Sequence, residues 1–420
     1  MERSTRGIMK QVVCLRCMIC GREYDPKEAS YTCSSCGPEG ILDVIYEYHR
    51  IARRFTKAKL SANRDLSIWR YLDLLPLRPQ TPRPPLKVGW TPLYPSGRLG
   101  RDLGCPHLFI KDDGRNPTGS FKDRASALGV AKALELGQRV ITCASTGNAA
   151  SSLAGISASV GLRTIIFVPR NAPKAKVAQL LIYGAQVFSV RGTYDEAFDL
   201  CLEAGREFGW YSRNTAYNPF LSEGKKTAAL EICEQLGWQA PDMVFVSVGD
   251  GCIIGGLWKG FHDLCQLGFI DRQPRLVGVQ AEGCQPLKRA FEADQPVKTV
   301  SPRTIADSIA VGHPRDALKA LRAVRESDGF MVAVSDEEIL EAMGLLARET
   351  GVFGEPAGVA GFAGLRKALS DGRVKAHQRV VVVVTGSGLK DVDSALQAAA
   401  KPTEIEPTLA AVTLHIGRNT

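Results

Sequence analysis

The sequence predicts an α/β fold in which helices cover parallel sheets, preceded by a small cysteine-rich module. Short β-branched runs follow one another after about Cys105, among them RVITC, TIIFVP, QVFSV, MVFVSV, RLVGVQ and RVVVVVTG, and they are typical of strands buried on both faces. Ala-rich amphipathic stretches such as AASSLAGISASVG separate these runs. Strands that alternate with helices form parallel sheets through right-handed connections. The third observation is a pair of cysteine knuckles near the amino terminus.

The cysteine knuckles predict a structural zinc site. Cys17 and Cys20 form one pair, Cys33 and Cys36 form the second after twelve intervening residues, and a glycine follows each pair. Each knuckle turns two thiolates toward one point, and four thiolates complete a tetrahedral site with no open position for water. The metal should therefore stabilise the module and take no part in catalysis. Cys14 lies just upstream and could compete as a ligand.

The length of 420 residues is sufficient for two or three domains. A proline-dense stretch, PLRPQTPRPPLKVGWTPLYP, predicts a semi-rigid connector. We expect five segments: a zinc ribbon at 1–50, a helical and Pro-rich connector joining the large domain at 51–105, a mainly small α/β domain at 106–230, a large α/β domain at 231–400, and a tail at 401–420.

Composition excludes several classes of function. The 53 basic and 44 acidic residues give a net charge of +9, but the basic residues are dispersed, so we expect no nucleic-acid partner. No apolar run is long enough to span a bilayer, so we expect no membrane association. The first residues, MERSTRGIMKQVV, lack the apolar stretch of a secretory signal, and the scattered cysteines suit a reducing compartment. These features predict a cytoplasmic protein.

Three loops of the α/β region could bind a ligand, because such sheets bind ligands at the carboxyl ends of their strands. The turn NPTGSFKDR delivers Lys122 to a helix start, although a lysine there is usually a solvated charge. Ser145, Thr146 and Asn148 follow the strand ITCA, where backbone N–H groups could hold a carboxylate or the residues could simply cap a helix. Gly249 and Gly251 follow the strand VFVSV and permit backbone amides to face a phosphate.

The motifs PTGSFKDR, ASTGN, a glycine loop after a strand and TGSGLKD, in that order behind a four-cysteine module, resemble the threonine synthase family of pyridoxal phosphate enzymes. The resemblance covers about Cys14 to Leu396. It implies two doubly wound parallel-sheet domains with the cofactor between them. It also implies conversion of O-phosphohomoserine and water to threonine and phosphate, a small amino-acid substrate and a homodimer.

The resemblance also implies roles for single residues. Lys122 would be the Schiff-base lysine and the proton shuttle, Asn148 would bind the phenolic oxygen of pyridoxal 5'-phosphate, and Thr385 would meet the pyridine nitrogen. Ser145 and Thr146 would hold the substrate carboxylate. The loop that would cradle the cofactor phosphate comprises Gly249, Asp250, Gly251, Cys252 and Ile253.

The sequence departs from the family pattern at three positions, which are Ala149, Leu221 and Asp250. The family often carries a threonine at the first, an arginine that binds the substrate phosphate at the second, and an asparagine at the third. These departures leave the substrate open. Candidates for the missing cation are Arg213, Lys225 and Lys174.

Two alternative functions remain. One is a sister reaction on the same scaffold, in a serine or threonine dehydratase or an enzyme that uses O-phosphoserine. The other is a non-enzymatic zinc-ribbon binding protein, against which the presence of Lys122, Asn148 and Thr385 argues.

Overall fold

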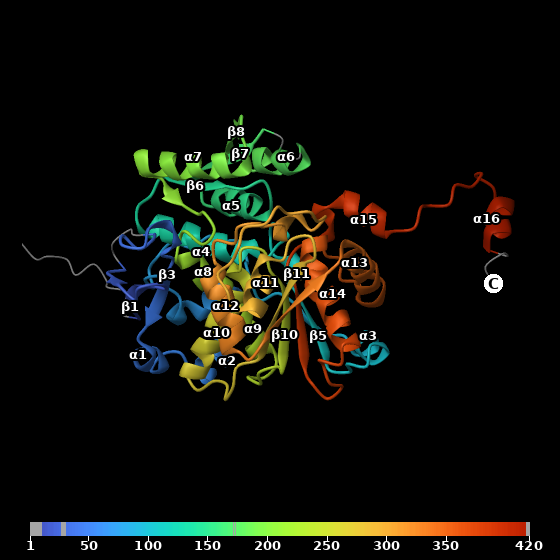
Figure 1. The fold of residues 1–420 in the computed structure, drawn as a ribbon, viewed down its shortest axis with the longest axis horizontal. Helices are drawn as coiled ribbons and strands as arrows, with labels where there is room; N and C mark the ends of the chain where they lie inside the picture. The colour runs from blue at the N-terminus through green and yellow to red at the C-terminus, as the bar shows by residue number, and fades with distance from the viewer. Residues whose placement is uncertain (1–10, 27–30, 171, 173, 417–420) are drawn as a thin grey trace, which may run out of the picture.

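Two sheets of mainly parallel strands form the body of the protein, and a small antiparallel sheet lies at its amino-terminal end in the computed structural model (Figure 1). The structure describes residues 11–26, 31–170, 172 and 174–416. In this part of the chain no helix is long and apolar enough to cross a membrane. The predicted α/β class is confirmed.

The larger sheet has six strands in the order β12-β11-β10-β13-β5-β4, and all of its pairings are parallel except that of β4 with β5. Its strands are β4 (Leu93–Pro95), β5 (Leu108–Asp112), β10 (Met243–Ser247), β11 (Arg275–Ala281), β12 (Phe330–Val334) and β13 (Val380–Val384). Alternate residues along β10 enter two different cores: Val244 and Val246 join the core beside α10, whereas Phe245 joins the core beside α14. Both faces of the sheet are therefore covered by helices.

The smaller sheet has four parallel strands in the order β8-β7-β6-β9. Its strands are β6 (Val140–Ala144), β7 (Arg163–Pro169), β8 (Gln186–Val190) and β9 (Tyr211–Ser212). Helices α5 and α6 cover one face and α7 the other, at the top of Figure 1. This second layered unit matches the expected pair of parallel-sheet domains.

The helices connect these strands as the sequence pattern predicts. The α-helices are α1 (Tyr48–Ala52), α2 (Lys57–Ala62), α3 (Gly97–Asp102), α4 (Lys122–Glu135), α5 (Asn148–Ala158), α6 (Lys174–Ile182), α7 (Tyr194–Glu207), α8 (Phe220–Lys225), α9 (Thr227–Gln235), α10 (Cys252–Gln266), α11 (Pro286–Ala293), α12 (Ala317–Glu326), α13 (Asp336–Thr350), α14 (Pro356–Ser370), α15 (Val392–Ala398) and α16 (Leu409–Ile416). Short 3-10 helices are η1 (Gly37–Glu39), η2 (Ile68–Leu74), η3 (Asp113–Arg115), η4 (Asp307–Ile309) and η5 (Gly388–Lys390).

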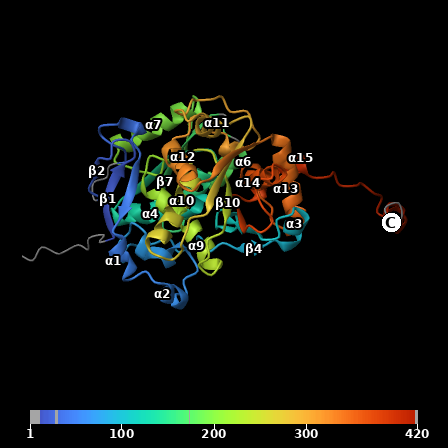
Figure 2. The same cartoon turned by 60° about the horizontal axis from the view of Figure 1, so that its bottom comes forward.

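The amino-terminal sheet, in the order β2-β1-β3, packs directly on the larger α/β unit (Figure 2). Its strands are β1 (Val12–Cys17), β2 (Glu23–Tyr24) and β3 (Leu42–Tyr46). The Lys259 ammonium on α10 donates to the Val44 carbonyl at 2.7 Å, and the Lys319 ammonium on α12 donates to the Leu42 carbonyl at 2.8 Å. Leu42 and Val44 also belong to the same hydrophobic core as α10. The module thus shares its core with the α/β body.

The predicted segment boundaries stay predictions, but the position of β5 bears on one of them. β5 falls within the expected small domain at 106–230, and in the structure it pairs with β13 in the larger sheet. The chain therefore passes through the larger sheet before it builds the smaller one. In the expected tail, α16 is exposed and lies away from the body (Figure 1).

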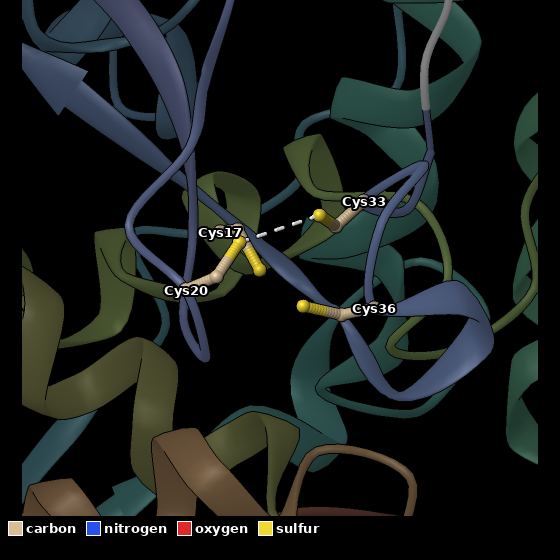
Figure 3. A group of neighbouring side chains, drawn as sticks. All are labelled: Cys17, Cys20, Cys33 and Cys36. Carbon is tan, nitrogen blue, oxygen red and sulfur yellow. Dashed lines mark hydrogen bonds between the residues drawn. The ribbon is translucent and has the colours of Figure 1, made fainter.

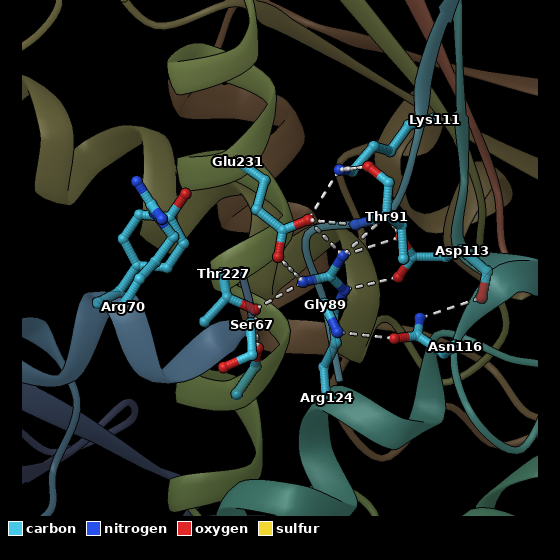
Figure 4. A network of polar contacts seen from close by, with 12 residues as sticks. Ser67, Arg70, Gly89, Thr91, Lys111, Asp113, Asn116, Arg124, Thr227 and Glu231 are labelled. Carbon is cyan, nitrogen blue, oxygen red and sulfur yellow. Dashed lines mark hydrogen bonds and ion pairs between the residues drawn. The ribbon is translucent and has the colours of Figure 1, made fainter. Parts of the chain in front are cut away.

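A buried ionic network joins α4 to the larger sheet (Figure 4). The Arg124 guanidinium contacts Asp113 at 2.6 Å through Nε and Glu231 at 2.5 Å through Nη1. The Lys111 ammonium on β5 lies 2.7 Å from the other oxygen of Glu231. Burial alone raises the pKa of the Glu231 carboxyl, but Arg124 and Lys111 outweigh burial and lower that pKa to about 2. The network fixes the start of α4 beside β5 and α9.

We predict that Glu231→Gln lowers the free energy of unfolding by about 3–5 kcal/mol, because it leaves two buried cations short of a counter-charge. Denaturant unfolding would measure the loss. Glu341→Gln is the matched control, since Glu341 forms an exposed pair with Arg366 at 3.4 Å and should cost no more than about 1 kcal/mol. Equal losses in the two variants would contradict the prediction.

The same pair makes a pH-dependent contribution to stability. The pKa of Glu231 is lowered from 4.5 to about 2 on folding, so this contribution is present above pH 4.5 and is lost as the pH falls toward 2. Glu231→Gln should therefore be less sensitive to acid in that range.

Candidate active site

Loops from both parallel sheets meet around a cavity of about 490 Å³, which we call the outer cavity. A narrow inner chamber of about 40 Å³ adjoins it and shares Lys122, Asn148 and Asp250 with it. The lining includes segments at or directly after the carboxyl ends of β6, β7, β9, β10 and β13. The two spaces are lined by all of the residues predicted to bind cofactor or substrate, which are Lys122, Ser145, Thr146, Asn148, Gly249, Asp250, Gly251, Cys252, Ile253 and Thr385.

Lys122 is the first residue of α4, and backbone pairing holds it beside the loop after β13. The Phe121 N–H donates to the Thr385 carbonyl at 2.9 Å, and the Ser387 N–H donates to the Gly119 carbonyl at 2.9 Å. Gly119 has a φ of +81°, which only glycine adopts readily, so the turn before the lysine depends on it. These contacts bring Lys122 and Thr385, which are far apart in sequence, into one chamber.

The environment of Lys122 favours a neutral amine. Burial lowers the pKa of its ammonium to about 8, and the nearby positive charges of Lys225 and Arg213 contribute to the shift. The opposing effects of Cys252 and Asp250 are smaller than the effect of burial. A lysine in this state can act as a nucleophile or as a base near neutral pH.

Two glycines allow the loop after β10 to pack closely against neighbouring segments. A Cβ at Gly251, where φ is +96°, would lie 2.6 Å from Ala320 Cβ, and a Cβ at Gly249 would lie 3.0 Å from Ile309 Cα. The Asp250 carboxylate accepts from the Arg315 backbone N–H at 3.1 Å, so it is engaged by the segment before α12. The start of α10 lines the inner chamber, and backbone N–H groups at a helix start suit a phosphate.

Sequence reasoning missed Glu355, which contacts a predicted site residue. The Asn148 side-chain amide donates to Glu355 Oε1 at 2.5 Å and to Ser308 Oγ at 3.4 Å. Burial raises the pKa of Glu355, whose carboxyl lines the inner chamber. The only signal was the GEPAG turn, a carboxylate before a proline at a helix start. Its position beside Asn148 depends on the tertiary structure, because the two residues are 207 apart in sequence.

Ser145 and Thr146 lie at the start of α5, on the wall of the outer cavity. The Ser145 hydroxyl accepts from the Gly147 N–H at 3.2 Å, and the Ala144 N–H donates to the Asn214 side chain at 2.8 Å. The second bond ties the end of β6 to the segment after β9. Backbone N–H groups at a helix start can receive a carboxylate.

The three candidate cations are Arg213, Lys225 and Lys174, and the structure describes the side chains of the first two. Arg213 follows β9, is 1% exposed and lines the outer cavity. Lys225, at the end of α8, is also buried and acts on the pKa values of both Lys122 and Cys252, so it lies near the start of α10. The side chain of Lys174 lies outside the described part of the structure. Leu221 packs in the interior, 3.0 Å from the Cβ position of Gly129 on α4.

The four predicted zinc ligands form one cluster (Figure 3). The sulfur atoms of Cys17, Cys20, Cys33 and Cys36 all lie within 4.8 Å of one another. Gly40 lies behind them, where a Cβ would come 2.6 Å from Cys33 Cβ. The cluster does not include Cys14. Four thiol groups with this spacing match the donor set of a tetrahedral metal such as zinc.

Comparison with known proteins agrees with this geometry. A family model described as "Pyridoxal-phosphate dependent enzyme" matches residues 85–386. The chain is 44% identical to a threonine synthase of Methanocaldococcus jannaschii over 93% of this chain and 96% of that protein. It is 40% identical to a threonine synthase of Methanosarcina acetivorans over 95% of this chain and 97% of that protein.

Solved structures of other enzymes share the fold. The processed form of threonine deaminase isoform 2 from Solanum lycopersicum is 22% identical with a TM-score of 0.62, over 74% of this chain and 87% of that one. A diaminopropionate ammonia lyase from Escherichia coli is 18% identical with a TM-score of 0.64, over 82% and 92%. Since the family model covers most of the chain and the similar sequences cover nearly all of it, the chain belongs to the threonine synthases within the pyridoxal-phosphate dependent enzymes.

Proposed function

We propose that this enzyme converts O-phosphohomoserine and water to threonine and phosphate, with pyridoxal phosphate attached through Lys122. Family membership implies a small amino-acid substrate. The observation that carries the proposal is 44% identity over 93% of the chain to a protein named threonine synthase. The cavity supports it, because the buried Arg213 guanidinium lines its wall and could bind an anionic substrate.

The residues around the inner chamber fit the cofactor. Lys122 offers an amine with a pKa lowered by burial, and Gly249 and Gly251 line the inner chamber beside the helix start that would receive the phosphate. Lys225 is buried and forms no ion pair in the described part of the chain, so it would add a positive charge there. When bound, the cofactor supplies an electron sink for charge developing on the substrate carbons.

The side chains of this protein would then orient the substrate and move protons. The Lys122 amine would take a proton from the substrate α-carbon and return protons at neighbouring carbons. Asn148 would bind the phenolic oxygen, and the neutral hydroxyl of Thr385 would meet the ring nitrogen without holding it protonated. Ser145 and Thr146 would bind the substrate carboxylate at the start of α5.

A sister reaction is the second candidate. The threonine deaminase from Solanum lycopersicum shares the fold, and Leu221 stands where the family often has an arginine. A dehydratase of threonine or serine would not need an unpaired guanidinium in its cavity. An enzyme acting on O-phosphoserine would need a guanidinium for the substrate phosphate. Product analysis therefore has to distinguish the dehydratase and the O-phosphoserine enzyme from the main proposal.

The remaining proposals concern nucleic-acid binding, cellular location and oligomeric state. Dispersed basic residues support the absence of a nucleic-acid partner. The scattered cysteines, none of which forms a disulfide in the described part of the chain, support a cytoplasmic enzyme. A homodimer is the assembly that the family resemblance favours.

We also propose that the metal at Cys17, Cys20, Cys33 and Cys36 is structural zinc. Four thiolates leave no coordination position for substrate, which supports this role. The module also shares its hydrophobic core with α10, the helix that begins at the inner chamber. The metal would therefore stabilise the support of the cofactor site.

Lys122→Ala should abolish covalent attachment of the cofactor, because no other amine would replace it. Borohydride reduction followed by peptide mapping would find the label on the Lys122 peptide of the unsubstituted enzyme and nowhere in the variant. A label on another lysine would contradict the assignment.

The rate of covalent attachment should rise with pH through a midpoint near 8, because only the neutral Lys122 amine reacts with an aldehyde. Lys225→Met removes a neighbouring positive charge, so it should raise the pKa of Lys122 and shift the midpoint upward. Asp250→Asn removes a negative charge and should shift it downward. Stopped-flow absorbance at saturating cofactor would measure the three midpoints, and shifts of the same sign would contradict the electrostatic explanation.

Phosphate release from O-phosphohomoserine should exceed turnover of O-phosphoserine and threonine, measured as kcat/KM on the purified holoenzyme. The reason is the expected fit of a four-carbon phosphorylated amino acid between the start of α5 and the cavity cations. Deamination of threonine without phosphate release from O-phosphohomoserine would favour the sister reaction.

Cys33→Ser should lose zinc and lower the Tm, because the cluster holds β1 and β3 against α10. Elemental analysis and thermal unfolding would measure both effects. Cys14→Ser is the control and should keep its zinc, since Cys14 lies outside the cluster. Activity that fell to zero in a folded variant and returned in proportion to added zinc would contradict a structural role.

A further inference from the structure

We propose that Arg213 is the residue that binds the phosphate group of the substrate, an inference that rests on the proposed function and adds a specificity residue to it. Arg213 follows β9, at the carboxyl edge of the smaller sheet, and its side chain lines the outer cavity together with Lys122 and Thr146. The backbone N–H of Arg213 donates to the Thr142 carbonyl at 2.8 Å, which fixes its position on the sheet.

The guanidinium of Arg213 is buried without a counter-charge. Its Nε donates to the Ser126 hydroxyl at 3.1 Å, and its Nη1 donates to the Thr215 hydroxyl at 3.4 Å. Its Nη2 has no hydrogen-bond partner in the described part of the chain, and no ion pair involves the side chain there. A buried charge without an anion is costly, so this arrangement indicates that an anion arrives with a ligand.

Other buried arginines in the structure are paired. Arg124 contacts Asp113 and Glu231, and Arg70 lies 2.6 Å from Glu234. Those ion pairs stabilise the fold. Arg213 lacks such a partner although it is as buried as they are, so stability does not account for it. Planar guanidinium groups bind phosphate oxygens in pairs, which suits a phosphorylated substrate.

The second guanidinium at the outer cavity is already engaged. Arg315 lies 3.0 Å from Asp195 and stacks over Phe198, with 4.1 Å between its guanidinium carbon and the ring centroid. Lys122 is assigned to the cofactor, and Lys225 lies near the start of α10. Arg213 is therefore the cation best placed for a second phosphate, distinct from that of the cofactor.

Leu221 and Arg213 lie beside the same point of α4. The Leu221 side chain packs 3.0 Å from the Cβ position of Gly129 on α4, and Arg213 Cγ lies 4.0 Å from the same point. The two side chains thus occupy neighbouring space against one helix. The Arg213 guanidinium can therefore line the cavity while position 221 remains apolar.

The test compares Arg213→Leu, Arg213→Lys and the unsubstituted holoenzyme. Arg213→Leu should raise the KM for O-phosphohomoserine about ten- to hundredfold, because a charge-assisted contact to phosphate is lost. Its Kd for threonine, which has no phosphate, should stay within about twofold of the unsubstituted value, and Arg213→Lys should recover part of the KM. A purely structural role would weaken the binding of both ligands.

Arg315→Leu is the matched control, because Arg315 lines the same cavity but is paired with Asp195. A larger KM increase in Arg315→Leu than in Arg213→Leu would overturn the inference. The double variant Arg213→Leu with Leu221→Arg should regain part of the phosphate affinity, because the two side chains lie beside the same point of α4.

Calorimetric titration of the holoenzyme with inorganic phosphate separates this inference from the proposed function. Weaker phosphate binding in Arg213→Leu supports the inference even if O-phosphohomoserine is not the substrate. Equal phosphate binding by Arg213→Leu and the unsubstituted holoenzyme overturns it, whatever the reaction proves to be.

Discussion

The buried contact between Arg124 and its two carboxylates positions most of what surrounds the cavity. Arg124 lies two residues after Lys122 on α4, Asp113 follows β5, and Glu231 belongs to α9. One guanidinium therefore ties the start of α4 to both neighbours at once, in a place from which water is excluded. Because the turn before Lys122 also pairs with the loop after β13, the lysine is held from two sides. The larger sheet supplies this support, while α4 itself packs against the smaller one.

Of the residues that the structure describes, several buried basic ones are paired with a carboxylate, and others are not. Arg124, Lys226 and Arg70 are paired with carboxylates, and each pair joins segments that are distant in sequence. Arg213 and Lys225 are buried without an ion pair in the described part of the chain, and both act on the pKa of Lys122. The paired cations stabilise the fold, whereas Arg213 and Lys225, whose charges act on Lys122, create a need for anions near the active site. A phosphorylated cofactor and a phosphorylated substrate would together meet that need.

The main elements of the fold could be predicted because they depend on local periodicity. The run QVFSV became β8 over the same residues, and TIIFVP lies within β7. Both flank helices whose apolar pattern was also visible. β5 was not among the predicted runs, because Lys111 and Asp112 interrupt its apolar pattern, and Lys111 is buried through tertiary contacts that include its ion pair with Glu231. Glu355 was missed because its contact with Asn148 joins residues 207 apart, and no local pattern indicates such a contact.

The sequence by itself determined the cysteine cluster, the alternation of strands and helices, and the loops that carry Lys122, Asn148 and Thr385. Each of these is set by neighbours within a few turns of chain, through metal-ligand spacing, side-chain periodicity or glycine conformation. Only the tertiary structure decided which charges are paired. Arg124 finds Glu231 at a separation of 107 residues, whereas Arg213 finds no carboxylate in the described part of the chain. Pairing depends on distance and burial in space, and no local pattern in the sequence encodes either one.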